Sequence, residues 1–336
     1  MIDGYPLVSV IISTYNSEKF IRGRIDNLLR QSIIDKIEII VINSGSLQNE
    51  EEIIRKYQDQ YPNIVYYRTE NRETIYKAWN RGIKLAKGQF ICNANTDDRL
   101  HPDALEILSN VLIKNRDVAL VYADQYITDI PNLEFDETLL KRKCLFPDFD
   151  KIKQMQHCII GSQPMWRASL HFNDNIWFDE TYEVCGDQDF ELRIAEKYRI
   201  IHISQLLGYF YKPNDKKNKE LENPAITMSE VEKINKKYVD EFVKKQSLKE
   251  LEKVLNIFKK FIIIPIPAYI FLKRLYRIID KNIYPRKYFY TVEFMYFFVI
   301  KICTSLNRKA EAIKYCKRYL RFKKSEKISE LYKDLS

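Results

Sequence analysis

The stretch GQFICNANTDDRLHP, residues 88–102, indicates both the fold class and the place of the site. Gly88 ends a helical pattern, and the apolar run QFICNA after it predicts a strand. Two adjacent carboxylates, Asp97 and Asp98, follow where that strand ends, and Pro102 opens a further helical pattern. Because like charges so close together repel, this pair needs either open water or a bound cation.

Four further apolar runs around this stretch alternate with segments whose apolar residues recur at helical spacing. This alternation predicts an α/β fold with a Rossmann-like, mostly parallel sheet and helices on both faces. In open sheets of this kind, ligands bind outside the carboxyl ends of the strands. The predicted strands span 7–14, 37–43, 63–68, 89–94 and 118–124, and the predicted helices span 17–32, 49–60, 74–88 and 103–115.

Polar clusters occupy three of those strand ends, at residues 13–16, 43–46 and 95–98. The first turn, STYNSEKF, has no glycine, and no GxxxxGK[ST] pattern occurs, which argues against nicotinamide, flavin and ATP-loop sites. A diphosphate bound here then needs a divalent cation, and Mg²⁺ or Mn²⁺ binds one or two carboxylates together with ligand phosphates. Asp97 and Asp98 suit that task. The alternative is that both are ordinary residues of a solvated turn before a helix.

Four segments, in order, resemble the motifs of the family 2, GT-A type glycosyltransferases, which transfer sugars from nucleotide donors. They are VSVIISTYN at 8–16, IEIIVINSGS at 37–46, ETIYKAWNRGIKLAKGQFICNANTDD at 73–98 and FDETYEVCGDQDFELRIAEKY at 178–198. The resemblance extends over roughly residues 7–212. It implies a GT-A fold, with a catalytic domain at 1–212 divided into a nucleotide-binding half at 1–124 and an acceptor-side half at 125–212. It also implies a nucleoside-diphosphate sugar as the donor.

The resemblance implies a role for each motif in binding the donor. The first loop and the end of the second strand are expected to hold the base and ribose. Arg72 and Arg99 are expected either to approach the phosphates or to lie on the surface as ordinary cations. The segment NSGS lacks the acidic residue usual in the family, so an Asn carbonyl or a Ser hydroxyl replaces it as the acceptor. The residues implied for nucleotide-sugar binding are Ser13, Tyr15, Asn43, Ser44, Arg72, Asn95 and Asp97.

The metal ligands and the catalytic base follow from the same resemblance. Asn95 takes the first position of the D-x-D pattern, so Asp97 is expected to bind Mn²⁺ or Mg²⁺ directly. Asp98 is expected to bind that metal as well, through water, or to orient the loop. Asp187 aligns with the family's base, although Gly186 replaces the Glu that often precedes it. One carboxylate without a nucleophile constellation implies a single in-line displacement with inversion. The alternative role of Asp187 is to stabilise a helix N-terminus.

The acceptor is expected to meet residues 125–170 and the segment around the base. Trp and Arg side chains suit sugar stacking and hydrogen bonding, and Arg167 and His171 lie close to Trp166 in the sequence. Core packing is the alternative for Trp166. The residues implied for the acceptor side are Gln163, Trp166 and Asp189.

The last third of the chain differs in charge from the rest. Residues 241–336 carry 23 Lys+Arg against 9 Asp+Glu, whereas the first 240 residues carry 32 against 37. A charged linker at 213–224 opens a basic helical region, 213–336, whose apolar segments at 261–272 and 288–303 are not convincing membrane spans. Their basic flanks favour helices on a membrane surface. A packed cap on the catalytic domain and a homo-oligomer surface are the alternatives.

Composition and cysteine spacing limit the function further. With 46% hydrophobic and 30% charged residues, the chain is typical of a globular protein. Six cysteines without a CxxC pair, and no signal peptide, favour the cytoplasm or the inner face of its membrane. No nucleic acid is expected as a partner, because RNP-like, helix-turn-helix and zinc patterns are lacking.

These observations predict an inverting glycosyltransferase that acts on a glycan or lipid-linked acceptor in the biosynthesis of cell-surface polysaccharide. The alternative is a basic membrane-associated or nucleic-acid-binding protein whose GT-A-like domain is inactive.

Overall fold

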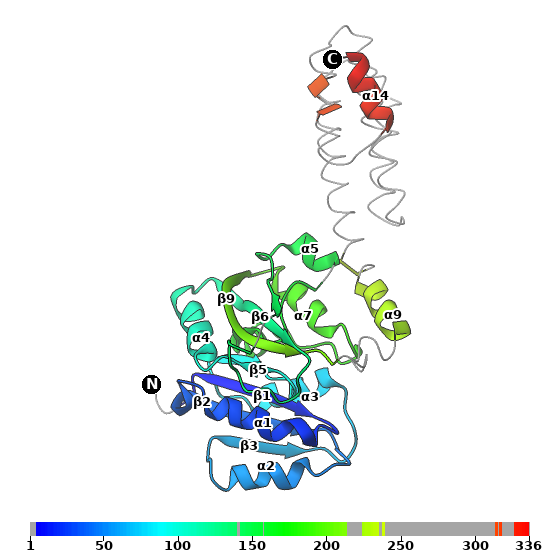
Figure 1. Cartoon of the computed structure of the whole chain (residues 1–336). Coiled ribbons are helices and arrows are strands. Elements are labelled where there is room, and N and C mark those ends of the chain that lie inside the picture. Colours follow the sequence, from blue (N-terminus) through cyan, green and yellow to red (C-terminus); the bar gives the residue numbers. More distant parts are fainter. Residues whose placement is uncertain are drawn as a thin grey trace. The chain divides into compact units, whose positions relative to one another are not determined.

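A computed structural model of the chain divides it into two compact units, Met1–Ile234 and Asn235–Ser336 (Figure 1). The first unit contains every residue predicted for the site. It also runs past the predicted boundary at residue 212 and ends with helix α9 (Pro224–Ile234). The structure describes residues 5–139, 142–156, 158–213, 224–234, 237–238, 313–314, 316–317 and 326–335.

In the second unit, the structure describes helix α14 (Glu326–Leu335), whose Ile328 and Leu335 are buried. The apolar segments at 261–272 and 288–303 lie outside the described residues. Among the residues that are described, no helix is long and apolar enough to cross a membrane. A membrane-surface role, a packed cap and an oligomer surface therefore all stay predictions.

A nine-stranded sheet forms the first unit, in the order β3-β2-β1-β4-β8-β6-β9-β5, with β7 paired to β6. Strands β3, β2, β1 and β4 are parallel neighbours, as the alternation predicts. Beyond them the sheet is mixed, because β8 runs antiparallel to both β4 and β6. The strands are β1 (Val8–Thr14), β2 (Ile37–Asn43), β3 (Ile64–Arg68), β4 (Phe90–Asn93), β5 (Arg99–Leu100), β6 (Val118–Thr128), β7 (Arg142–Cys144), β8 (Met165–Arg167) and β9 (Arg199–Tyr211).

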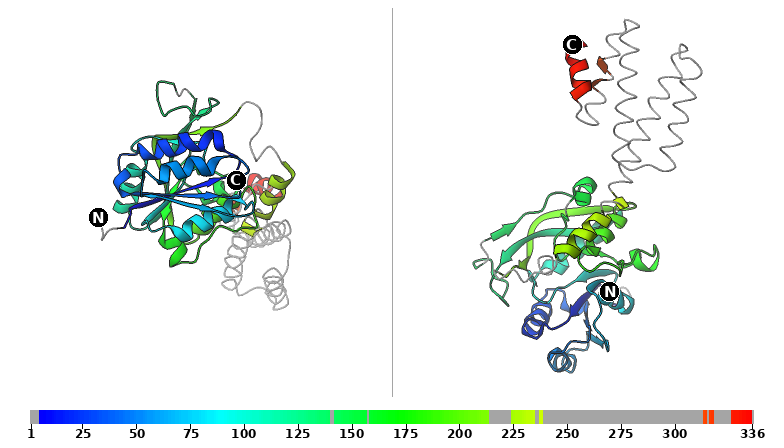
Figure 2. Two further views of the ribbon diagram at one scale, coloured as in Figure 1. Left: turned by 90° about the horizontal axis from the view of Figure 1, so that it is seen from below. Right: turned by 90° about the vertical axis from the view of Figure 1, so that its right-hand side faces the viewer.

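Helices cover both faces of the parallel part of this sheet (Figure 2). On one face, Val10 and Ile12 of β1 share a core with residues of α1, α2 and α4. On the other face, Ile40 and Ile42 of β2 pack against Ala78 of α3. The helices of the first unit are α1 (Glu18–Leu29), a 3₁₀ turn η1 (Ile34–Lys36), α2 (Glu50–Gln58), α3 (Ile75–Leu85), α4 (Ala104–Lys114), α5 (Lys151–Gln156), α6 (Ser169–Phe172), α7 (Gly186–Ile194) and α9.

Gly88 does not terminate a helix, although its position after the 74–88 pattern suggested so. Helix α3 ends three residues earlier, and Gly88 instead lies against β1, where its N–H donates to Ser9 Oγ at 2.8 Å. A Cβ at this position would stand 2.6 Å from the Ser9 backbone nitrogen, which real Cβ contacts do not allow. The glycine is therefore required by the close approach of two backbone segments.

We expect Gly88→Ala to lower the free energy of unfolding by about 1–3 kcal/mol, because β1 or the 86–89 turn has to shift to admit the methyl group. Lys87→Ala is the matched control, since Lys87 is exposed and its backbone N–H still donates to Glu38. Urea unfolding of both variants measures the difference. Equal stability of the two variants would show that the turn can move at no cost.

Candidate active site

Hydrogen bonds join the loops that follow β1 and β2 at their carboxyl ends. Asn43 closes the second loop: its Oδ1 accepts from the Ser46 N–H at 2.8 Å, and its Nδ2 donates to the Tyr66 hydroxyl at 3.1 Å. Ser46 Oγ donates to Glu50 Oε2 at 2.6 Å and accepts from the Asn16 N–H at 3.0 Å. Asn43 is fully buried and so shapes this loop from within.

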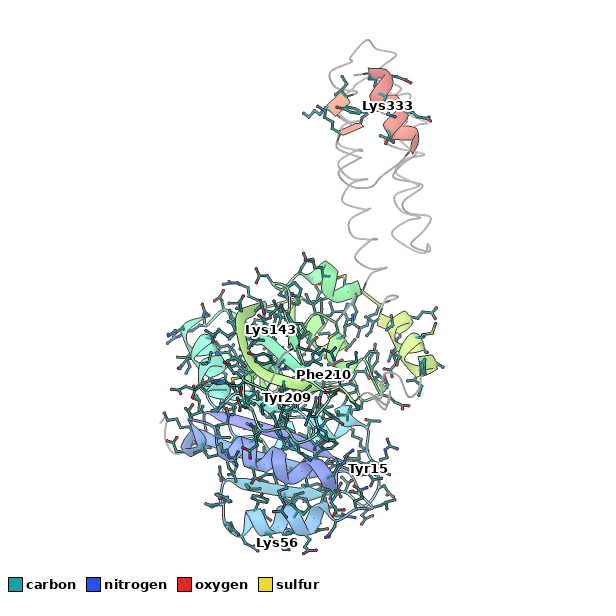
Figure 3. All side chains as sticks on the ribbon, in the orientation of Figure 1. Tyr15, Lys56, Lys143, Tyr209, Phe210 and Lys333 are labelled. Carbon is teal, nitrogen blue, oxygen red and sulfur yellow. The ribbon has the colours of Figure 1, made fainter. Side chains whose placement is uncertain are left out.

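Three residues predicted to bind the nucleotide come together beside that loop. The Ser44 hydroxyl is buried, and among the described residues it has no hydrogen-bond partner. Gly45 has a left-handed backbone, with φ 63°, and a Cβ there would stand 3.2 Å from the Arg72 nitrogen. The guanidinium of Arg72 lies 4.5 Å from the centre of the Tyr15 ring. Tyr15 follows directly after the last residue of β1 (Figure 3). Ser13 is partly buried within β1 itself.

The turn after β4 gives its two acids different surroundings. Asp98 is only 1% exposed: its Oδ1 accepts from the Tyr211 N–H at 3.0 Å, and its Oδ2 accepts from Asn95 Nδ2 at 3.1 Å. Burial, and after it the charge of Asp97, raises the pKa of Asp98 to about 7. Asp97 itself is partly exposed. Asp98 is therefore tied to β9 and to Asn95, and Asp97 is the more exposed acid of the pair.

Two buried guanidinium groups hold the same turn by hydrogen bonds to its backbone. Arg24 Nη1 donates to the Asp98 carbonyl at 2.9 Å, and Arg99 Nη1 donates to it at 2.7 Å. Gln163 joins them, because its Oε1 accepts from Arg24 at 2.8 Å and its Nε2 donates to the Arg99 carbonyl at 3.2 Å. Arg99 and Gln163 are 2% and 4% exposed. Arg99 is therefore neither a surface cation nor exposed for a phosphate contact, and Gln163 contacts buried arginines, contrary to its predicted place against the acceptor.

The residues at this turn fit a hard divalent cation that also binds a diphosphate. Within the described part of the chain, no cluster of three or more His, Cys, Asp or Glu side chains could hold a metal unaided. Such a cluster is not needed, since Mg²⁺ and Mn²⁺ keep several waters and bind one or two carboxylates plus substrate phosphates. Asp97 would supply the carboxylate, and Asn95 beside it is half-buried and donates an N–H of its amide to Asp98.

Helix α7 presents Asp187 at its second residue, partly exposed. Its Oδ1 accepts from the Gln188 N–H at 2.8 Å and lies 3.4 Å from the Tyr76 hydroxyl, which also donates to the Val184 carbonyl. The ring of Tyr76 covers Gly186, where a Cβ would stand 2.7 Å from a ring carbon. A glycine at this position thus makes room for the tyrosine that reaches the predicted base.

Glu191 lies one helical turn beyond Asp187 and differs from it in environment. It is 3% exposed, and its Oε2 accepts from Gln154 Nε2 at 2.6 Å. Burial, followed by the charge of Asp187, raises the pKa of Glu191 well above its usual value. Burial thus favours the protonated form of Glu191, whereas Asp187, one turn earlier, is partly exposed.

Two residues predicted to meet the acceptor are buried instead. Asp189 is fully buried, and its Oδ2 accepts from Arg193 Nε at 2.8 Å. Trp166 is 2% exposed, and its indole N–H donates to His171 Nε2 at 2.7 Å. Its ring lies 5.5 Å from that of Phe190, centre to centre, in an edge-on arrangement. Core packing, the alternative considered for Trp166, is therefore its role. Trp166 packs against α7 through Phe190.

The buried His171 links stability to pH. Burial lowers its pKa to about 4, and its Nε2 accepts a hydrogen bond that only the neutral ring can accept. The unfolded chain takes up the proton near pH 6.5, so the neutral ring stabilises the fold above that pH and this stability is lost as the pH falls towards 4. Between pH 7 and 5 we expect His171 to account for a loss of about 2 kcal/mol in unfolding free energy.

Urea unfolding of the wild type and His171→Gln at both pH values measures this loss. The glutamine variant keeps an acceptor for Trp166 without a titrating ring, so the difference in unfolding free energy between pH 7 and 5 should be smaller in the variant. The same pH difference in both proteins would contradict a neutral buried ring.

Comparison with known proteins identifies the domain built around these residues. Residues 9–171 match the sequence profile of Glycosyl transferase family 2. The chain contains a family 2 glycosyltransferase domain. The matched region includes the Tyr15, Ser44 and Asp97 loops, and Asp187 lies beyond its end.

Curated relatives of this chain include polysaccharide synthases. Hyaluronan synthase of Pasteurella multocida is 29% identical over 206 residues, which are 61% of this chain and 20% of that protein. Poly(ribitol-phosphate) beta-glucosyltransferase of Bacillus spizizenii is 28% identical over 208 residues, 61% of this chain and 32% of that protein. The match to the two first relatives, hyaluronan synthase and chondroitin synthase, thus spans only about a fifth of their lengths.

Solved structures share the fold. Residues 1–349 of S. aureus TarS in complex with UDP superpose with a TM-score of 0.51 at 20% identity, over 61% of this chain and 60% of that chain. The complex of the same protein with UDP-GlcNAc gives 0.50 at 21% identity, over 62% and 59%. The sheet with its helices is therefore a GT-A fold, as the sequence motifs implied.

Proposed function

We propose that this family 2 glycosyltransferase is inverting and metal-dependent, and that it moves a sugar from a nucleoside-diphosphate sugar to a hydroxyl acceptor. The observation that carries the proposal is the asymmetry of the two acids after β4. The buried Asp98 carboxylate accepts hydrogen bonds from the Tyr211 N–H and from Asn95, and these bonds hold the turn in which Asp97 is partly exposed. Catalysis of sugar transfer requires that the diphosphate and the charges that stabilise it are held in a fixed position, and a hydrogen-bonded turn can hold one of those charges.

In the proposed reaction, Asp187 accepts the proton of the acceptor hydroxyl as its oxygen attacks the anomeric carbon. The attack comes from the face opposite the nucleotide, so the bond to the diphosphate oxygen breaks as the new C–O bond forms. Configuration at that carbon inverts, and the nucleoside diphosphate leaves with the bonding electrons. The hydroxyl of Tyr76, 3.4 Å from Asp187 Oδ1, lies where it can orient that carboxylate.

The donor is bound by residues of the first three loops. Tyr15 and Arg72 offer an aromatic face and a guanidinium, and Ser44 offers a buried hydroxyl for the base or ribose. Asp97 would hold Mn²⁺ or Mg²⁺, and this cation, when bound, would neutralise charge that develops on the diphosphate. The TarS structures contain UDP and UDP-GlcNAc, which makes uridine diphosphate sugars the first donors to test.

We further propose that the product is a cell-surface polysaccharide or lipid-linked glycan, made in the cytoplasm or at the inner face of its membrane. The relatives named hyaluronan synthase, chondroitin synthase and poly(ribitol-phosphate) beta-glucosyltransferase support this. The basic charge of residues 241–336 supports contact with anionic headgroups at the membrane surface. The same region is the proposed contact if the chain forms a homo-oligomer instead.

A donor panel tests the proposed activity. The purified chain is incubated with uridine, guanosine and thymidine diphosphate sugars and Mn²⁺, and release of free nucleoside diphosphate is measured with and without EDTA. We expect one class of donor to turn over and EDTA to stop its turnover. Turnover that EDTA leaves unchanged would contradict the metal, and silence with every donor, in the presence of glycan acceptors, would contradict the activity.

A further inference from the structure

Helix α9 places a buried carboxylate on the segment that precedes Asp187. The side chain belongs to Glu230, which is 8% exposed although the region after residue 212 is highly charged. Glu230 Oε1 accepts from the Glu183 N–H at 2.6 Å, and Oε2 accepts from the N–H groups of Val184 at 2.9 Å and Cys185 at 2.8 Å. One carboxylate thus binds three consecutive backbone donors directly before α7.

Such a contact is strong because successive N–H groups next to a helix N-terminus form a concave anion site. Hydrogen bonds to an ionised acceptor are about twice as strong as neutral ones. A second side chain of α9 binds the same segment: Lys233 Nζ donates to Thr181 Oγ1 at 2.7 Å and lies 3.8 Å from the centre of the Tyr182 ring. Helix α9 therefore holds residues 181–185 at two points.

The backbone of Val184 is held from both sides. Its N–H donates to Glu230 of α9, and its carbonyl accepts from the Tyr76 hydroxyl of α3. The same hydroxyl lies 3.4 Å from Asp187 Oδ1. The chain just before the predicted base is thus fixed between a helix of the nucleotide-binding half and a helix that follows the acceptor-side half.

We infer that Glu230 is a positioning residue: it fixes residues 183–185 and thereby sets the place of the Asp187 carboxylate. The inference rests on the proposed role of Asp187. It also makes α9 part of the catalytic unit, so that a protein ending at residue 212 would lack this support. In an enzyme, a displacement of about 1 Å at the reacting groups can cost 100-fold in rate.

Hydrogen exchange tests the contact independently of any activity. The amide exchange of residues 183–185 is compared in the wild type, Glu230→Ala, Glu230→Gln and Glu232→Gln, the last an exposed acid on the same helix. We expect exchange at least about tenfold faster in Glu230→Ala, since local opening then no longer breaks three hydrogen bonds, and wild-type exchange in Glu232→Gln. Unchanged exchange in Glu230→Ala would overturn the inference whether or not the enzyme is active.

Turnover tests the positioning. We expect kcat to fall by about 10- to 100-fold in Glu230→Ala, with the donor KM unchanged, because the nucleotide loops lie on other elements. Glu230→Gln should fall less, since its amide oxygen still accepts, and it carries the test if the alanine variant does not fold. A kcat equal to that of Glu232→Gln, or equal losses in kcat and donor affinity, would overturn the inference. A wild type that turns over no donor would instead contradict the proposed function.

Discussion

Asp187→Asn is expected to lower kcat by about 10²–10⁴-fold while the affinity for the nucleoside diphosphate stays unchanged. The amide keeps the shape of the side chain and an oxygen that accepts from the Gln188 N–H, but it cannot take a proton from the acceptor. Steady-state rates of nucleoside diphosphate release give kcat, and calorimetric titration of the diphosphate gives the affinity.

Glu183→Gln is the matched control for this variant. Glu183 is an exposed acid four residues earlier, and its contact to Glu230 uses only its backbone. The control should therefore keep wild-type turnover. If Asp187→Asn retained more than about a tenth of kcat, the loss would fall below the range of a general base, and another group would have to accept the proton.

The second large effect is expected at Asp97. Asp97→Asn should lower kcat/KM by about 100-fold or more, because losing one preorganised charge at the leaving group costs this much in comparable sites. It should also raise the Mn²⁺ concentration needed for half-maximal turnover. Its stability should stay close to that of the wild type, since Asp97 is partly exposed.

Asp98→Asn provides the contrast to this variant. Its side chain is buried and holds the turn, so the substitution should act mainly on stability: Asn95 Nδ2 then faces an amide in place of a carboxylate. Thermal unfolding and Mn²⁺ titrations of both variants separate the two roles. Equal Mn²⁺ dependence in Asp97→Asn and the wild type would contradict Asp97 as the ligand.

The sequence was sufficient to predict the parallel part of the sheet. Its central strands β1 and β2 are rich in β-branched residues and need cover on both faces, and polar clusters at the ends of β1, β2 and β4 mark the loops. The structure accordingly brings Tyr15 and Arg72 together and places Asp97 at the end of β4. The mixed part could not be predicted in the same way, because β8 has only three residues and shows no alternation of its own.

The structure shows which residues suited to sugar binding are buried, and sequence patterns alone could not show this. Gln163, Trp166 and Asp189 are chemically suited to a sugar, but each is buried and satisfies an interior partner. Tyr76 is not singled out by the sequence, because at helical spacing from Trp79 it resembles any core aromatic. Only the fold shows that it covers Gly186 and reaches Asp187.

The configuration of the released sugar tests the central claim most directly. The donor that turns over is incubated with the enzyme without acceptor, so that water can take the place of the hydroxyl, and the first anomer released is observed by ¹H NMR before mutarotation. A single displacement assisted by Asp187 gives the anomer opposite to that of the donor, and Asp187→Asn abolishes its formation. Release of the same anomer as in the donor would contradict the mechanism.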